Sequence, residues 1–126
     1  GAYSTGGKEI GEIIETSTEG NIALTANTAK VIASITLPKG KYTLQGNSRF
    51  NSISSAGARL LSISTNTTMN YNAYSSTYAP ANSNGYVNVT RIYNVQVKSG
   101  ETINLLGYCN TAINCSYRYL KAIRVG

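Results

Sequence analysis

The chain has 126 residues, 41% hydrophobic and 13% charged, which suits one domain with a single core, although the charged share lies well below the usual value of about 25%. Its net charge of +6 is scattered among apolar residues, without a basic run or a nucleic-acid-binding motif, so we expect no nucleic-acid partner. Histidine and aspartate are absent, which excludes histidine-based catalysis and histidine metal sites, so we expect a protein that is not an enzyme and uses no cofactor.

The first part, residues 1–20, is expected to form a stem, a linker or an edge strand in front of a head domain over residues 21–126. Its isoleucines are spaced as in a helix, but Gly11 and the Thr-Ser-Thr run at residues 16–18 disfavour a stable helix. No apolar run is long enough to span a bilayer, so we expect no membrane insertion.

Short runs of alternating apolar and polar residues, with turn residues between them, predict strands in the first half of the chain. These strands are expected at residues 21–28, 29–37, 41–50 and 58–65. In the second of them, one face is expected to hold Val31, Ala33, Ile35 and Leu37. The third alternates most clearly, and one of its faces holds Tyr42, Leu44, Gly46, Ser48 and Phe50. Such regular spacing predicts an all-β sandwich or jelly roll.

Residues 66–85 carry no charge and combine tyrosines with Asn, Ser and Thr. Tyrosine rings offer flat apolar faces for sugar C–H groups, and the polar residues offer donors and acceptors, so this segment is a candidate saccharide site. The candidate site residues are Tyr71, Tyr74, Tyr78, Asn82 and Asn84, with Arg59 and Arg91 as possible partners of anionic groups. The alternative is that these tyrosines fill the core or a trimer axis and that the two arginines are solvated.

The last part of the chain predicts three strands, at residues 86–97, 102–109 and 116–125, joined by short turns into an antiparallel meander. The first and last of them carry apolar residues on both faces. In the first, Ile92 lies on one face and Val89 on the other, and in the last, Leu120 lies on one face and Tyr119 on the other. A second buried face supplied by an oligomer would explain this pattern, and so would a bulge that shifts the register.

Two cysteines, Cys109 and Cys115, flank the turn at residues 110–114. If the turn folds back tightly, the two thiols face each other across a hairpin, and a disulfide that closes a short loop is possible. Two reduced, packed thiols are the equal alternative, because the sequence does not reveal the redox compartment.

Three short motifs occur in the same order as in a known group of domains. They are T-L-P-K-G-K-Y-T-L-Q-G-N-S-R-F at residues 36–50, R-I-Y-N-V-Q-V-K-S-G-E-T-I-N-L-L at residues 91–106 and S-Y-R-Y-L-K-A-I-R-V at residues 116–125. With them, residues 21–125 resemble the jelly-roll tip domains of bacteriophage tail fibres and receptor-binding proteins, and are similar to the globular heads of the complement and tumour-necrosis-factor superfamily. Residues 65–85 carry no motif of this group, as expected if they hold the recognition surface.

The resemblance implies an all-β antiparallel jelly-roll sandwich of about eight to ten strands, assembled as a homotrimer with the terminal strand near the threefold axis. It also implies binding without catalysis. We therefore expect the host-recognition tip of a phage tail fibre, located at the virion tail tip, with a bacterial cell-wall or surface saccharide as its partner. A structural trimerisation cap of a fibre or spore-surface filament and a protein-binding ligand of the signalling type are alternatives, because a fold alone does not fix the ligand.

Overall fold

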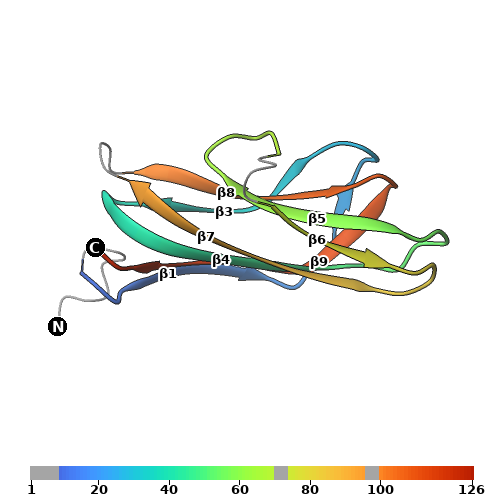
Figure 1. The fold of residues 1–126 in the computed structure, drawn as a ribbon, viewed down its shortest axis with the longest axis horizontal. Coiled ribbons are helices and arrows are strands. Elements are labelled where there is room, and N and C mark those ends of the chain that lie inside the picture. Colours follow the sequence, from blue (N-terminus) through green and yellow to red (C-terminus); the bar gives the residue numbers. More distant parts are fainter. Residues whose placement is uncertain (1–8, 70–73, 96–99) are drawn as a thin grey trace.

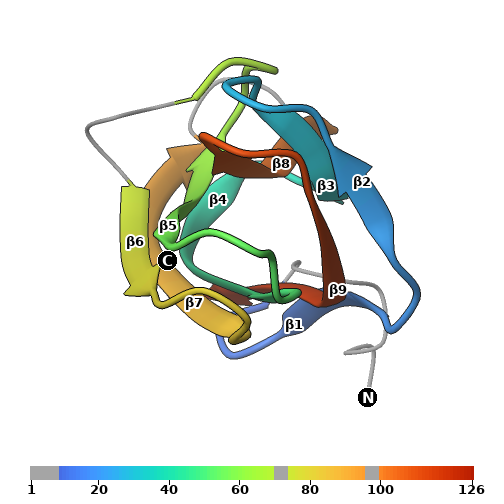
Figure 2. The same cartoon turned by 90° about the vertical axis from the view of Figure 1, so that its right-hand side faces the viewer.

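The computed structural model describes residues 9–69, 74–95 and 100–126, and within these residues all regular secondary structure is β-strand (Figure 1). The strands are β1 (Ile13–Thr18), β2 (Ile22–Leu24), β3 (Lys30–Leu37), β4 (Gly40–Phe50), β5 (Gly57–Ser64), β6 (Tyr74–Ala79), β7 (Gly85–Val95), β8 (Glu101–Cys109) and β9 (Ile113–Arg124). They form two facing antiparallel sheets, which confirms the predicted jelly-roll sandwich (Figure 2).

The first sheet, sheet A, has the order β1-β9-β4-β7, with β2 also paired to β9, and the second, sheet B, has the order β3-β8-β5-β6. The predicted meander of the last three strands is therefore wrong, because β7 and β9 lie in sheet A while β8 lies in sheet B. The chain therefore changes layers between β7 and β8 and again between β8 and β9. Their pairing partners are distant in sequence: β4 pairs with both β7 and β9, and β8 pairs with both β3 and β5.

Strand β4 confirms the alternation read from the sequence. The side chains expected together on one face, those of Tyr42, Leu44, Ser48 and Phe50, are all buried between the sheets. Gly46 completes this face, and a Cβ added there would lie 2.6 Å from Cδ1 of Leu105 on the opposite sheet. A larger residue at this position would force the Leu105 side chain to shift, because that side chain fills the space beside Gly46.

Two bulges change which side chains reach the core. The register of β3 against β8 shifts between Val31 and Ala33, so that Ile32 is buried and these two neighbours are only half-buried, contrary to the face expected from the sequence. The register of β9 against β4 also shifts, and the bulge includes Tyr117, whose φ of 52° is left-handed. Beyond this bulge Leu120 and Ala122 point into the core.

Apolar side chains also occupy the outer face of sheet A. Ile92 on β7 is 68% exposed, and Tyr117 and Val125 near the end of the chain are exposed as well. Sheet A therefore contains both features that could explain the apolar residues on two faces, a bulge in β9 and apolar side chains on its outer face. The edge of this sheet is β1, which pairs with β9 over its whole length, so residues 13–18 form an edge strand.

Candidate functional site

Strand β6 presents two of the predicted tyrosines to solvent. Tyr74 is 46% exposed and Tyr78 is 72% exposed, and both lie on the same side of the strand because side chains alternate along it. Ser76 lies between them on this side, whereas Ser75 and Thr77 are half-buried on the other. Three residues lie between the two tyrosines, so their Cα atoms are about 13 Å apart along the strand. A ligand that contacts both rings must therefore be longer than one sugar ring.

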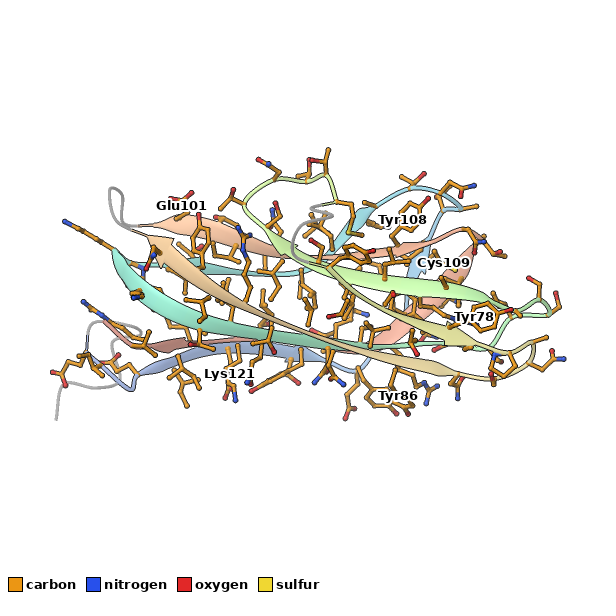
Figure 3. All side chains as sticks on the ribbon, in the orientation of Figure 1. Tyr78, Tyr86, Glu101, Tyr108, Cys109 and Lys121 are labelled. Atoms are coloured by element: carbon orange, nitrogen blue, oxygen red, sulfur yellow. The ribbon has the colours of Figure 1, made fainter. Side chains whose placement is uncertain are left out.

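Strands β5 and β8 extend this surface across sheet B. Ala58 is the register partner of Tyr78, and Leu60 is the partner of both Ser76 and Tyr108. Tyr108 points outward from the same layer in Figure 3 and is half-buried. We call this set, Tyr74, Ser76, Tyr78, Leu60 and Tyr108, the sheet B tyrosine surface. The sequence analysis missed Tyr108 and Leu60, although Tyr108 alternates with the core residues Leu105 and Cys109 and so belongs to the outer face.

A hollow adjoins this surface at Tyr108. It has a volume of about 380 Å³ and is lined by Asn27, Thr28, Ala29, Tyr108 and residues 67–69. The Tyr108 hydroxyl donates a hydrogen bond to Oδ1 of Asn27 (3.3 Å), and Nδ2 of Asn104 donates to the carbonyl of Asn66 (3.1 Å). The Asn104 contact holds the segment that follows β5 over the outer face of sheet B, where it appears above β8 in Figure 1. The Tyr108 contact ties β8 to the loop between β2 and β3. The lining carries no charge, in keeping with the uncharged segment noted in the sequence.

The other predicted site residues lie elsewhere. Tyr71 falls outside the described residues. Asn82 and Asn84 are exposed in the turn between β6 and β7, and Asn82 has a left-handed φ of 61°. The Asn82 amide donates to the carbonyl of Ile53 (2.6 Å), which ties this turn to the loop between β4 and β5. The two asparagines therefore lie at the end of β6, beyond the tyrosines.

Arg59 is not a surface residue. Its side chain is 0% exposed, and its guanidinium donates to the carbonyls of Gly57 (2.7 Å), Ala79 (2.9 Å) and Ser83 (3.5 Å). Both sequence-based interpretations of Arg59, as a ligand-binding and as a solvated residue, are wrong for this reason. Its parity with Leu61 and Ile63 in β5 was the signal that places it inside. Arg59 instead holds the start of β5 and the end of β6 together beneath the turn.

Arg91 lies on β7 in sheet A, and its side chain reaches across to sheet B. It is half-buried, donates to the carbonyl of Ile63 (2.8 Å) and places its guanidinium 5.2 Å from the ring centre of Tyr93. Arg91 therefore joins β7 to β5 at a backbone carbonyl beside Ser62, the register partner of Tyr74.

The two cysteines belong to different sheets, and both are free and buried. Burial raises the pKa of the Cys115 thiol to about 11, because the charged thiolate loses hydration. The thiol is thus protonated at neutral pH and is a poor nucleophile. Of the two alternatives, the structure shows the reduced, packed thiols.

The outer face of sheet A differs in character from the sheet B tyrosine surface. Near the chain's C-terminus, Ile13 on β1 pairs with Ile123 on β9. Thr43 on β4 pairs with both Ile123 and Ile92 on β7, so the three isoleucines and Thr43 form one row across four strands. Ile13 is 52% exposed. We call this set the isoleucine row. Four apolar or β-branched side chains in register form a flat surface that favours burial.

At the other end of the same face, Arg49 lies between two tyrosines. Tyr86 is its register partner on β7, and the guanidinium lies 5.2 Å from the ring centre of Tyr117. Between this group and the isoleucine row the face is polar, and Tyr119 donates a hydrogen bond to the Glu15 carboxylate. Figure 3 shows Tyr86 and Lys121 projecting from sheet A, on the side of the sandwich opposite Tyr108.

In the described part of the chain, no group of three or more His, Cys, Asp or Glu side chains could hold a metal ion. The same residues contain no helix that is long and apolar enough to cross a membrane.

Comparison with known proteins identifies the architecture. No protein-family model matches the chain, and no curated protein matches it. Among solved structures, the chain is similar to the Eiger TNF of S. frugiperda, with a TM-score of 0.54 and 8% sequence identity over 90% of this chain and 93% of that one. An identity this low shows the fold and nothing about the ligand. The chain therefore has a jelly-roll sandwich of the tumour-necrosis-factor type.

Proposed function

We propose that this protein is a non-catalytic recognition head that binds a bacterial surface saccharide through the sheet B tyrosine surface, as the host-recognition tip of a phage tail fibre. The observation that carries the proposal is the pair of exposed rings of Tyr74 and Tyr78 on one side of β6, with uncharged neighbours. Aromatic rings beside hydroxyl and amide groups stack on sugar C–H faces and bond sugar hydroxyls. The phage assignment comes from the resemblance of the three sequence motifs.

The uncharged character of this surface favours a saccharide over other ligands. Residues 66–85 contain no charged side chain, so the surface lacks the basic groups that phosphate or nucleic-acid binding requires. The separation of about 13 Å between the Cα atoms of the two tyrosines suits a polymer whose sugar units lie along β6. The hollow beside Tyr108 offers room for a branch or a substituent of that polymer.

Self-association is the second part of the proposal. The isoleucine row would be buried if copies of the chain met through the outer face of sheet A, and a homotrimer is the assembly that the sequence resemblance implies. Sheet B would then remain free, because its outer face lies on the opposite side of the sandwich. At 13.4 kDa per chain, such a trimer would have a mass near 40 kDa.

A polysaccharide pull-down, followed by titration calorimetry with the binding polymer, tests the saccharide site. The double variant Tyr74→Ala/Tyr78→Ala is expected to lose at least tenfold in affinity, because stacking on each ring is lost. The matched control is Tyr86→Ala, which removes an equally exposed tyrosine from sheet A and is expected to bind as the wild type does. Unchanged binding by the double variant would remove this site assignment.

Light scattering of the purified chain tests self-association. The double variant Ile13→Lys/Ile92→Lys places two charges in the isoleucine row and is expected to be monomeric. Ser76→Lys adds a charge to the outer face of sheet B and is expected to keep the wild-type mass. A wild-type protein that forms a trimer but binds no saccharide would instead support the alternative function, a structural cap of a fibre or spore filament.

A further inference from the structure

A second hollow lies at the end of the sandwich remote from the C-terminus. There the loop at residues 51–56, between β4 and β5, meets the turn at residues 110–112, between β8 and β9, and Figure 2 looks onto this end. The hollow has a volume of about 480 Å³ and is lined by residues 23–24, 51–53 and 112–114. This volume lies within the range of small-molecule sites, which is about 300 to 1,000 Å³.

The hollow has an apolar floor and an uncharged polar rim. Leu24 and Ile113 are register partners on β2 and β9, and both are buried. The small side chains of Ala23 and Ala112 leave the hollow open at its walls. Asparagine and serine side chains supply the rim, those of Asn51, Ser52 and Asn114. No lining residue carries a charge, so the hollow suits a neutral group with a small apolar part.

The rim is held in place before any ligand arrives. The Asn51 amide donates to the carbonyl of Asn114 (2.8 Å), and the Ser116 hydroxyl donates to Oδ1 of Asn51 (3.1 Å). The side-chain NH₂ of Asn51 donates to Oδ1 of Asn21 at 3.5 Å, which uses one of its two hydrogens. A side chain fixed in this way loses little entropy when it binds a ligand.

Two rim side chains have unused hydrogen-bonding capacity. Within the described residues, neither the side-chain amide of Asn114 nor the side-chain hydroxyl of Ser52 makes a hydrogen bond, and both residues are exposed. The neighbouring loop is anchored as well, because the carbonyl of Ile53 accepts from the Asn82 amide. The hollow therefore combines an anchored wall with free donors and acceptors.

We propose that this end hollow binds the acetamido group of a neutral N-acetylated sugar. The acetamido methyl would lie on Leu24 and Ile113, while its N–H and C=O would pair with the Asn114 amide and the second Asn51 hydrogen. An amide ligand matches the rim because it offers one donor and one acceptor beside a methyl group. The inference rests on the proposed saccharide function, but it uses a site separate from the sheet B tyrosine surface.

Protein-observed NMR with two sugars tests the proposal. N-acetylglucosamine is the ligand probe, and glucose, which carries a hydroxyl in place of the acetamido group, is the matched control. We expect N-acetylglucosamine to shift the amide signals of residues 51–53 and 112–114, with saturation transfer strongest at its acetamido methyl, and we expect glucose to shift them at least tenfold less at equal concentration. Equal shifts by the two sugars, or no shift of these signals by N-acetylglucosamine, would overturn the proposal.

Two variants separate this site from the tyrosine surface. Ala112→Leu fills the hollow from an exposed turn position and is expected to abolish the shifts, while its remaining amide spectrum shows an intact fold. Tyr74→Ala/Tyr78→Ala is expected to keep them. Loss of the shifts in the tyrosine variant but not in Ala112→Leu would move N-acetylglucosamine to β6 and refute the end hollow, without refuting saccharide binding by the head.

Discussion

The two outer faces of the sandwich both expose tyrosines, but the neighbours of these tyrosines differ. On sheet B, Tyr74 and Tyr78 stand beside serine, alanine and leucine on the edge strand β6. On sheet A, Tyr86 and Tyr117 flank Arg49, and the same face ends in the isoleucine row. An exposed aromatic ring alone therefore does not identify a ligand site. The cross-strand neighbours decide whether a face suits a sugar polymer or another protein surface.

The largest expected effect is a difference in stability between two arginine variants, one changed inside sheet B and one changed on the outer face of sheet A. Arg59→Ala is expected to lower the free energy of unfolding by about 3 to 5 kcal/mol, because it leaves a cavity and three carbonyls without their donor. Arg49→Ala is expected to lower it by about 1 kcal/mol or less, because it removes a partly exposed cation–π contact. Urea denaturation of both variants measures the two values, and equal losses would contradict the interior placement of Arg59.

The next effect is a loss of stability at alkaline pH that arises from Cys115, which lies on the core side of sheet A. The folded-state pKa of Cys115 is raised from 9.0 to about 11 by burial, so its contribution to stability is complete below pH 9 and is lost as the pH rises through 11. This loss is expected to reach about 2 to 3 kcal/mol. Cys115→Ala should therefore lose less stability than the wild type over this pH range. Parallel curves for the two proteins would rule out this role of Cys115.

A smaller effect tests how tightly the Leu105 side chain packs against the middle of β4. Gly46→Ala is expected to lower the free energy of unfolding by about 1 to 3 kcal/mol, because the added Cβ would meet Leu105. Gly20→Ala is the control, since nothing lies within 4 Å of a Cβ added there. Thermal unfolding compares the two variants. A Gly46→Ala protein as stable as the control would mean that the Leu105 side chain can move aside without loss.

The smallest effect should be found at the sheet B tyrosine surface itself. Tyr78→Ala is expected to change the free energy of unfolding by less than about 1 kcal/mol, because the ring is mostly in solvent. If the same variant lost several kcal/mol, Tyr78 would be part of the packing, and the binding assignment would lose its basis. Chemical denaturation in parallel with the saccharide titration gives both values on one preparation.

The sequence predicted local structure better than topology. The alternation in β4 placed Tyr42, Leu44 and Phe50 inside because strand periodicity depends only on near neighbours. The meander was wrong because turn residues show that the chain reverses, not which sheet it joins next. Likewise, the bulge at Ile32 moved a side chain into the core that strict alternation would have placed outside.

The candidate site was predicted in part. Tyr74 and Tyr78 share an exposed face, as their spacing of four residues requires for a strand, but Tyr108 and Leu60 reach the same surface only through long-range pairing. Arg59 was misplaced because charge argues for the surface, whereas its parity with Leu61 and Ile63 argues for the core. The three backbone carbonyls that accept its hydrogen bonds belong to the start of β5, the end of β6 and the turn between β6 and β7. No local sequence pattern reveals that these three places lie close together.

Amide hydrogen exchange of the whole chain, with and without bacterial surface polysaccharide, tests the division between the two faces most directly. Binding through the sheet B tyrosine surface predicts slower exchange in β6, in the adjoining part of β5 and in residues 67–69, with no change in β4 and β7. Slower exchange in β4 and β7, with β6 unchanged, would show that the saccharide binds sheet A and would contradict the account.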